Sequence, residues 1–125
     1  MSGAAVRIKR VYETAGPDDG LRILVDRLWP RGISREAARV DLWLKEIAPS
    51  DALRKRVHGD PAYPAASAAW AGFVIDYGAE LAANPPAVQT IRQHIADGPV
   101  TLLYAGRDMA RNNAAALRDW LLARS

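Results

Sequence analysis

Cysteine is absent from the chain, and its absence excludes several kinds of chemistry. Without a thiol, the protein can form no disulfide, no thiolate nucleophile and no zinc or iron–sulfur site ligated by cysteine. Long hydrophobic runs are also missing, since none approaches the roughly 20 apolar residues that a membrane-spanning helix needs. The first residues, Met1–Arg7, lack the apolar core of a signal peptide. We therefore expect a cytoplasmic protein without a membrane partner.

A strong charge of either sign is lacking as well, because 17 lysines and arginines face 14 aspartates and glutamates, for a formal net charge of +3. An excess this small supports at most a modest preference for anionic ligands. Hydrophobic residues make up 50% of the chain and charged residues 25%, which is the balance of a globular protein. A length of 125 residues is usual for one compact domain, so we expect a single domain over residues 1–125.

The spacing of apolar residues predicts a small parallel sheet. Val6–Tyr12 alternates apolar and basic residues, as a half-buried strand does. Leu21–Asp26 and Val100–Tyr104 contain nearly continuous apolar runs, which are typical of central strands buried on both faces. Val40–Ile47 fits a strand, a short helix or an extended loop. We expect an α/β fold with a mostly parallel sheet of three or four strands flanked by helices.

Capping residues and helical periodicity predict the helices. Ser34 and Ser50 are suitable N-caps, the second for a helix that runs to about His58. The longest helix is expected over residues 63–83, and the last is expected to begin near Asp108. Another helix follows Asn84, with proline in its first turn.

The predicted sheet places two polar segments on one rim. In open parallel sheets, ligands bind beyond the carboxyl ends of the strands. The two central strands end at Asp26 and Tyr104, so residues 26–32 and 105–113 should lie side by side. This rim is where we expect the working site.

Asp26, Arg27 and Arg31 form the first group of candidates on this rim. The two guanidinium groups could bind an anion, while Asp26 orients them or acts as an acid or base. The same three residues could instead form a structural ion pair that closes the edge of the sheet. The pattern alone does not choose between these alternatives.

Two aromatic residues could form the walls of such a site. Trp29 lies in a stiff turn that contains a proline and a glycine, and it could stack on a ligand or serve only as a packing anchor. Tyr104 ends the second central strand and is expected to form part of the wall.

Arg107, Asp108, Asn112 and Asn113 form a second polar group. In it, Arg107 would bind the anion, Asp108 would act as an acid or base and Asn112 would donate a hydrogen bond. Free N–H groups at the start of the last helix would favour an anion. Asp108 could instead be only the N-cap of that helix. Lys45 could contact an anion or, with Glu46, form an ordinary surface pair.

The sequence gives little support for a metal site, a cofactor site or a nucleic-acid-binding site. His58 and His94 are isolated and have no patterned partner, so we predict no bound metal and no cofactor. Basic residues cluster at Arg7–Tyr12 and Arg54–Arg56, but no helix-turn-helix and no interleaved aromatic residues accompany them. Weak nucleic-acid binding therefore remains only an alternative.

Several segments together carry a family resemblance that covers nearly the whole chain. They are Lys9–Tyr12, Asp19–Gly20, Leu24–Gly32, Leu44–Ser50, Leu53–Arg54, His58–Gly59, Glu80–Leu81, Thr101–Tyr104, Asp108, Asn112 and Ala114. The chain thereby resembles the YeaO-like family, small bacterial proteins filed under a domain of unknown function. The resemblance implies a compact α/β fold and no established activity. Wider relatives carry cysteine at the end of the strand matching Val100–Tyr104 and in the next helix start, and that thiol chemistry is impossible here.

The function that we expect from these features is binding of a small anionic or phosphorylated ligand at the rim, with or without chemical conversion. The alternative is a non-catalytic interaction or regulatory protein in which the same polar residues are structural.

Overall fold

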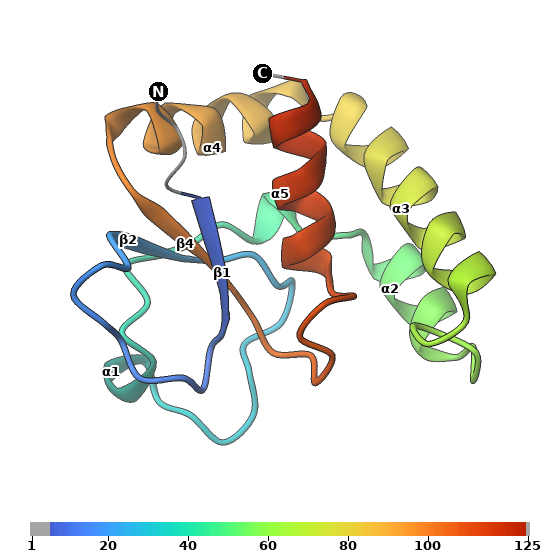
Figure 1. The fold of residues 1–125 in the computed structure, drawn as a ribbon, viewed down its shortest axis with the longest axis horizontal. Coiled ribbons are helices and arrows are strands. Elements are labelled where there is room, and N and C mark those ends of the chain that lie inside the picture. The colour runs from blue at the N-terminus through green and yellow to red at the C-terminus, as the bar shows by residue number, and fades with distance from the viewer. Residues whose placement is uncertain (1–5, 125) are drawn as a thin grey trace.

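Four strands form a single parallel sheet in the computed structural model, which describes residues 6–124 (Figure 1). The order across the sheet is β1 (Val6–Arg10), β4 (Val100–Tyr104), β2 (Leu21–Leu24) and β3 (Leu42–Trp43), and every neighbouring pair is parallel. This confirms the predicted α/β fold with a mostly parallel sheet, and β4 and β2 are the two central strands. The inference about a signal peptide concerns residues that lie mostly outside the described part.

Helices connect and cover the strands. Their bounds are α1 (Arg35–Ala38), α2 (Asp51–His58), α3 (Ser67–Ala82), α4 (Pro85–Asp97) and α5 (Asn113–Ala123). Ser34 and Ser50 accept hydrogen bonds from backbone N–H groups of the first turns of α1 and α2, so both are N-caps as predicted. The ambiguous stretch 40–47 contains β3 and one 3₁₀ turn. No described helix is both long enough and apolar enough to cross a membrane.

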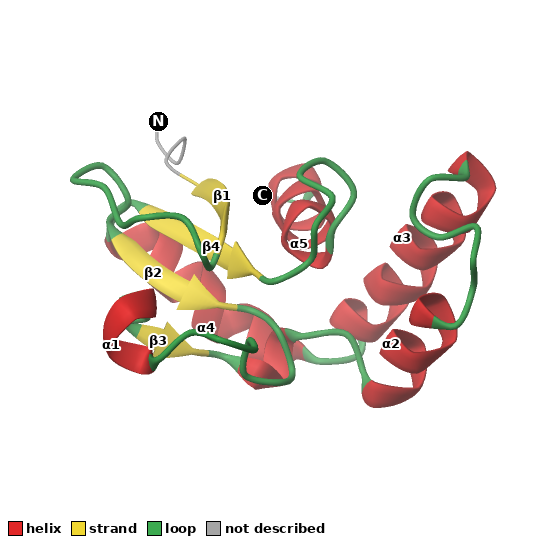
Figure 2. Ribbon diagram, turned by 90° about the horizontal axis from the view of Figure 1, so that it is seen from below, coloured by secondary structure: helices red, strands yellow, loops and turns green. Residues whose placement is uncertain are grey.

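The two faces of the sheet carry cores of different size, because side chains alternate along each strand. Ile23 and Leu102 belong to the larger core, which α3, α4 and α5 complete. Leu24 and Leu103 belong to a smaller core beneath α1 and the turn after β2. Figure 2 shows α2 and α3 standing to one side of the sheet, beyond α5. The carboxyl ends of the strands therefore open toward the space beside α2.

Two predicted helix starts are wrong. The longest helix begins at Ser67 and not near residue 63, because a residue that precedes proline, here Tyr63, avoids the helical conformation. The last helix begins at Asn113 and not near Asp108. The Asp108 carboxylate accepts the N–H groups of two following residues in a separate turn, and Asn112 caps the helix.

A buried ionic network covers the amino-terminal end of the smaller face. Asp19 accepts hydrogen bonds from Lys9 Nζ at 2.9 Å and from Arg22 NH1 at 2.6 Å, and the Asp19 and Arg22 side chains are each only 4% exposed. Thr101 Oγ1 in β4 donates to the Asp19 carbonyl at 2.7 Å. Asp19 therefore ties the loop before β2 to two neighbouring strands.

Candidate functional site

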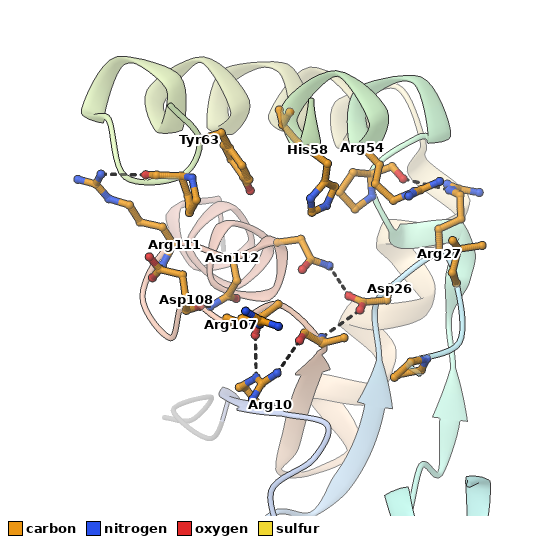
Figure 3. A pocket seen from close by; sticks show the side chains of 18 of the residues that line it. Arg10, Asp26, Arg27, Arg54, His58, Tyr63, Arg107, Asp108, Arg111 and Asn112 are labelled. Carbon is orange, nitrogen blue, oxygen red and sulfur yellow. Dashed lines mark hydrogen bonds between the residues drawn. The ribbon is translucent and has the colours of Figure 1, made fainter. Parts of the chain in front are cut away.

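A cavity of about 1090 Å³ opens at the carboxyl ends of the strands, where the sequence places the site. We call it the rim pocket. Its walls come from the loops after β1, β2 and β4, from α2 and from the α2–α3 connection (Figure 3). The lining residues are Arg10, Tyr12, Asp26, Arg27, Leu28, Trp29, Pro30, Arg31, Pro49, Arg54, Val57, His58, Tyr63, Pro64, Phe73, Ala105, Gly106, Arg107, Asp108, Arg111, Asn112 and Asn113.

Asp26 joins the two loops of the rim. Its Oδ2 accepts the N–H of Ala105 at 3.0 Å, and its Oδ1 accepts Asn113 Nδ2 at 3.0 Å. Burial raises the pKa of the Asp26 carboxyl group, although these hydrogen bonds and the nearby His58 act in the opposite direction. Within residues 6–124, Asp26 forms no ion pair with Arg27 or any other cation. The structural ion pair that the sequence allowed is therefore not formed.

Three arginines of the rim pocket are held by uncharged backbone carbonyl groups. Arg10 donates to Ala105 and Gly106, Arg27 donates to Ala48 and Pro49, and Arg111 donates to Pro64 and Ala65, over distances from 2.7 to 3.2 Å. A carbonyl group fixes a guanidinium group without neutralising its charge. These arginines are therefore ordered, and each retains N–H donors that the protein does not use.

The other cations of the pocket divide into paired and unpaired groups. Arg54 NH2 contacts Asp51 Oδ1 at 2.9 Å, while its buried Nε has no hydrogen-bond partner. The guanidinium groups of Arg31 and Arg107 form no hydrogen bond or ion pair with any part of the chain that the structure describes. These two exposed groups can rearrange around a ligand without losing an existing contact.

Trp29 serves as a packing anchor and also lines the rim pocket. Its ring meets Trp43 edge-on at 5.5 Å, and its indole N–H donates to the Ile33 carbonyl at 2.8 Å. The indole N–H of Trp43 donates to the Asp26 carbonyl at 2.8 Å. The two tryptophans thus fix the turn that carries Arg27 and Arg31.

Asp108 and Asn112 line the pocket, but most of their polar atoms are already engaged. Backbone N–H groups, from Arg111 foremost, lower the pKa of the Asp108 carboxyl group. Asn112 Nδ2 donates to the Asp108 carbonyl at 3.0 Å, and Asn112 Oδ1 accepts the N–H of Ala115 at 2.8 Å. Asn112 therefore caps α5, and only one N–H of its side-chain amide remains for a ligand.

The structure does not bring Lys45 or Tyr104 to the rim pocket. Lys45 Nζ lies 4.4 Å from the centre of the Trp43 ring, on the surface. Tyr104 is 1% exposed and belongs to the larger core, because its position in β4 directs the side chain beneath the sheet and not beyond its end. Seven of the nine candidates converge, and these two do not.

Sequence reasoning did not select several pocket residues as candidates for the site, namely Arg10, Arg54, His58, Tyr63 and Arg111. Arg10 ends β1, so the rule about carboxyl ends could have indicated it. Arg54 and His58 lie four residues apart on α2 and therefore share a face. Nothing in the sequence shows that this face turns toward the sheet.

We expect Asn112→Ala to lower the free energy of unfolding by about 1–2 kcal/mol, because it removes the N-cap of α5 and leaves a buried N–H without an acceptor. Urea denaturation measures the change. Gln89→Ala is the matched control, since Gln89 is exposed on α4. Equal effects of the two substitutions would contradict the capping role of Asn112.

Metal ligands are not clustered in this site. Among the residues with described positions, no three histidine, aspartate or glutamate side chains come close enough together to hold a metal ion. The site that the structure describes consists of guanidinium groups, two carboxylates, amides and an aromatic wall.

Comparison with known proteins places the chain among proteins of unknown function. A family model described as the inactive DUF488-N3 subclade matches residues 5–125. The uncharacterised protein YeaO of Escherichia coli K12 is 42% identical over 116 residues, which cover 93% of this chain and 96% of that protein. An uncharacterised protein of Mycobacterium tuberculosis H37Rv is 40% identical over 119 residues, or 95% of each chain. No solved structure matches significantly.

Proposed function

Because the chain belongs to the inactive DUF488-N3 subclade, a YeaO-like group of unknown function, we propose that it binds a small anionic ligand in the rim pocket and does not convert it. The description of the subclade as inactive favours binding over catalysis. In this proposal Asp26 and Asp108 position the loops of the pocket, since both carboxylates accept N–H donors from the rim.

One observation carries this proposal: five arginines line one pocket, and none of them has a carboxylate partner among the described residues. They are Arg10, Arg27, Arg31, Arg107 and Arg111. Positive charges that line one pocket repel one another, and a bound anion reduces that repulsion. Planar guanidinium groups also match phosphate and carboxylate oxygens in two-point hydrogen bonds.

The charge of the molecule is concentrated in this pocket. Six arginines and two aspartates line it, an excess of four positive charges, whereas the whole chain has an excess of three. Pairing of Arg54 with Asp51 reduces the local excess by one. A cleft lined by one sign of charge attracts and concentrates small ions of the other sign.

A second candidate function, docking of a protein partner, has support from the same rim. Leu28 and Met109 are 57% and 68% exposed, and both lie on loops at the carboxyl ends of central strands. Exposed apolar side chains beside a charged cleft are also found at protein interfaces. This alternative does not account for the five unpaired arginines as directly as an anion does.

The proposal predicts that phosphate stabilises the protein. At a concentration 100 times its dissociation constant, phosphate should raise the free energy of unfolding by about 2.7 kcal/mol. Thermal unfolding in increasing phosphate, at constant ionic strength set with sodium chloride, measures the shift. A melting temperature that does not respond to phosphate, sulfate or phosphate esters would contradict the proposal.

A further inference from the structure

The two sides of the rim pocket differ in chemistry, and this difference limits the kind of anion that fits. The loops after the strands supply Arg10, Arg31 and Arg107, while α2 and the α2–α3 connection supply the Tyr63 and His58 rings, with Arg54 beside them. We infer that the ligand is a phosphate ester of a flat unsaturated ring, of the nucleoside monophosphate class. The ring would lie against Tyr63 and the phosphate against the arginines. This inference rests on the proposed function.

The aromatic side is already ordered. The Tyr63 ring meets Phe73 edge-on at 5.5 Å and lies 6.4 Å from Trp70, and Phe73 is only 2% exposed. These contacts hold one side of the half-buried Tyr63 ring, while Tyr63 still lines the pocket. Stacking of a base on an aromatic ring is worth about 1–3 kcal/mol. An ordered ring loses little conformational entropy when it binds.

The same side offers hydrogen-bonding groups that the protein does not use. Within the described residues, the Tyr63 hydroxyl and the His58 ring have no hydrogen-bond partner, and the two rings meet edge-on at 6.2 Å. Burial, with a smaller effect from the charge of Asp108, raises the pKa of Tyr63 to about 12. The hydroxyl therefore stays protonated at neutral pH and retains a hydrogen-bond donor.

The cationic side lies opposite. Figure 3 shows Tyr63 and His58 along one side of the pocket, with Arg10, Arg107 and Asp108 along the other. Arg10 is held by two carbonyl groups, whereas Arg107 has no partner in the described chain. Arg10 and Arg107 both retain N–H donors that can bind a phosphate. A ligand that joins a phosphate to a flat ring would contact both sides.

The volume of the pocket also favours such a ligand. At about 1090 Å³, the pocket is slightly larger than the roughly 300–1,000 Å³ typical of small-molecule sites, so it has room for more than an inorganic anion. Inorganic phosphate alone would contact the arginines and leave the aromatic side uncovered. A nucleoside monophosphate carries both groups, a phosphate for the arginines and a flat ring for Tyr63.

Calorimetric titration of the full chain tests the inference. The probes are inorganic phosphate, ribose 5-phosphate and the 5′-monophosphates of adenosine, guanosine, cytidine and uridine. At least one nucleotide should bind about 5- to 150-fold more tightly than ribose 5-phosphate, which is the range that stacking of one base supplies.

Substitutions of Tyr63 test whether the ring of the ligand lies against this side chain. Tyr63→Ala should remove the advantage of the nucleotide and leave the affinity for ribose 5-phosphate unchanged, while Tyr63→Phe should retain most of that advantage. Ile75→Ala is the control, because Ile75 is 70% exposed on α3 and does not line the pocket. If circular dichroism shows that Tyr63→Ala does not fold, Tyr63→Leu makes the same comparison, since it keeps apolar volume without a flat ring.

The possible outcomes distinguish the inference about the ring from the proposed anion site. If ribose 5-phosphate binds and no nucleotide binds more tightly, the inference about the ring is wrong and the anion site stands. If Tyr63→Ala or Tyr63→Leu weakens both kinds of ligand equally, Tyr63 does not contact the ring and the inference is again wrong. If neither phosphate nor any ester binds, the proposed function fails together with the inference.

Discussion

Replacing Asp19 by alanine is expected to lower the free energy of unfolding by about 3–5 kcal/mol, because removal of one partner leaves a buried charge uncompensated. Asp19 accepts from Lys9 and Arg22, and the Arg22 side chain is 4% exposed. Arg22 would keep its bonds to the carbonyl groups of residues 38 and 39 but would have no carboxylate partner in the described chain. Urea denaturation monitored by circular dichroism measures the loss.

The neighbouring residue supplies the control for this substitution. Asp18 is exposed and takes no part in the network, so Asp18→Ala removes the same charge and should change stability by no more than about 0.5 kcal/mol. Similar effects of Asp18→Ala and Asp19→Ala would show that the buried network contributes little to the fold.

Acid should weaken the same network. Burial alone would raise the pKa of Asp19, but hydrogen bonds from Lys9, the Gly16 N–H and Arg22 outweigh it and lower the pKa from 3.8 to about 2. The stabilisation, on the order of 2 kcal/mol, is therefore fully present above about pH 4 and is lost as the pH falls through 2. Asp19→Ala should lack this part of the decrease in stability.

Replacing both Arg31 and Arg107 by alanine should weaken phosphate binding by about tenfold or more for each arginine, because each loses a charge-assisted hydrogen bond to the anion. The free energy of unfolding should change by no more than about 0.5 kcal/mol, since neither guanidinium group has a partner among residues 6–124. Calorimetric titration with phosphate and urea denaturation measure the two quantities.

A charge-matched double variant distinguishes a site from general attraction. Arg7→Ala with Lys55→Ala also removes two positive charges, and both residues are exposed and lie outside the rim pocket. At physiological salt their charges are largely screened beyond about 8 Å, so phosphate binding should be nearly unchanged. Equal weakening in the two double variants would contradict a localised anion site.

The sheet and its rim could be predicted because both follow from local patterns. The apolar runs before Asp26 and Tyr104 mark central strands, and the carboxyl ends of parallel strands necessarily share an edge. The short strand β3 is ambiguous in the sequence, since two residues are too few to show the alternation of apolar and polar side chains that marks a strand. The start of α5 was misplaced because Asp108 resembles an N-cap, and it does cap a turn, but not that of α5.

The composition of the site could not be predicted to the same depth. Arg54 and His58 reach the pocket only because α2 packs beside the strand ends, which is a matter of tertiary packing. The sequence also allowed a structural ion pair among Asp26, Arg27 and Arg31, whereas Arg27 donates to the carbonyl groups of residues 48 and 49. Arg27 lies in the loop after β2, where tertiary packing decides which partner it reaches.

The central claim is that the rim pocket binds a phosphate group, and a nuclear magnetic resonance titration tests it most directly. Uniformly ¹⁵N-labelled protein is titrated with sodium phosphate at constant ionic strength and pH. We expect saturable shifts in the backbone amides of residues 26–31 and 105–113 and in the Nε–H signals of the pocket arginines. Shifts that do not saturate, or that appear around Arg7 and Lys55 instead, would contradict the claim.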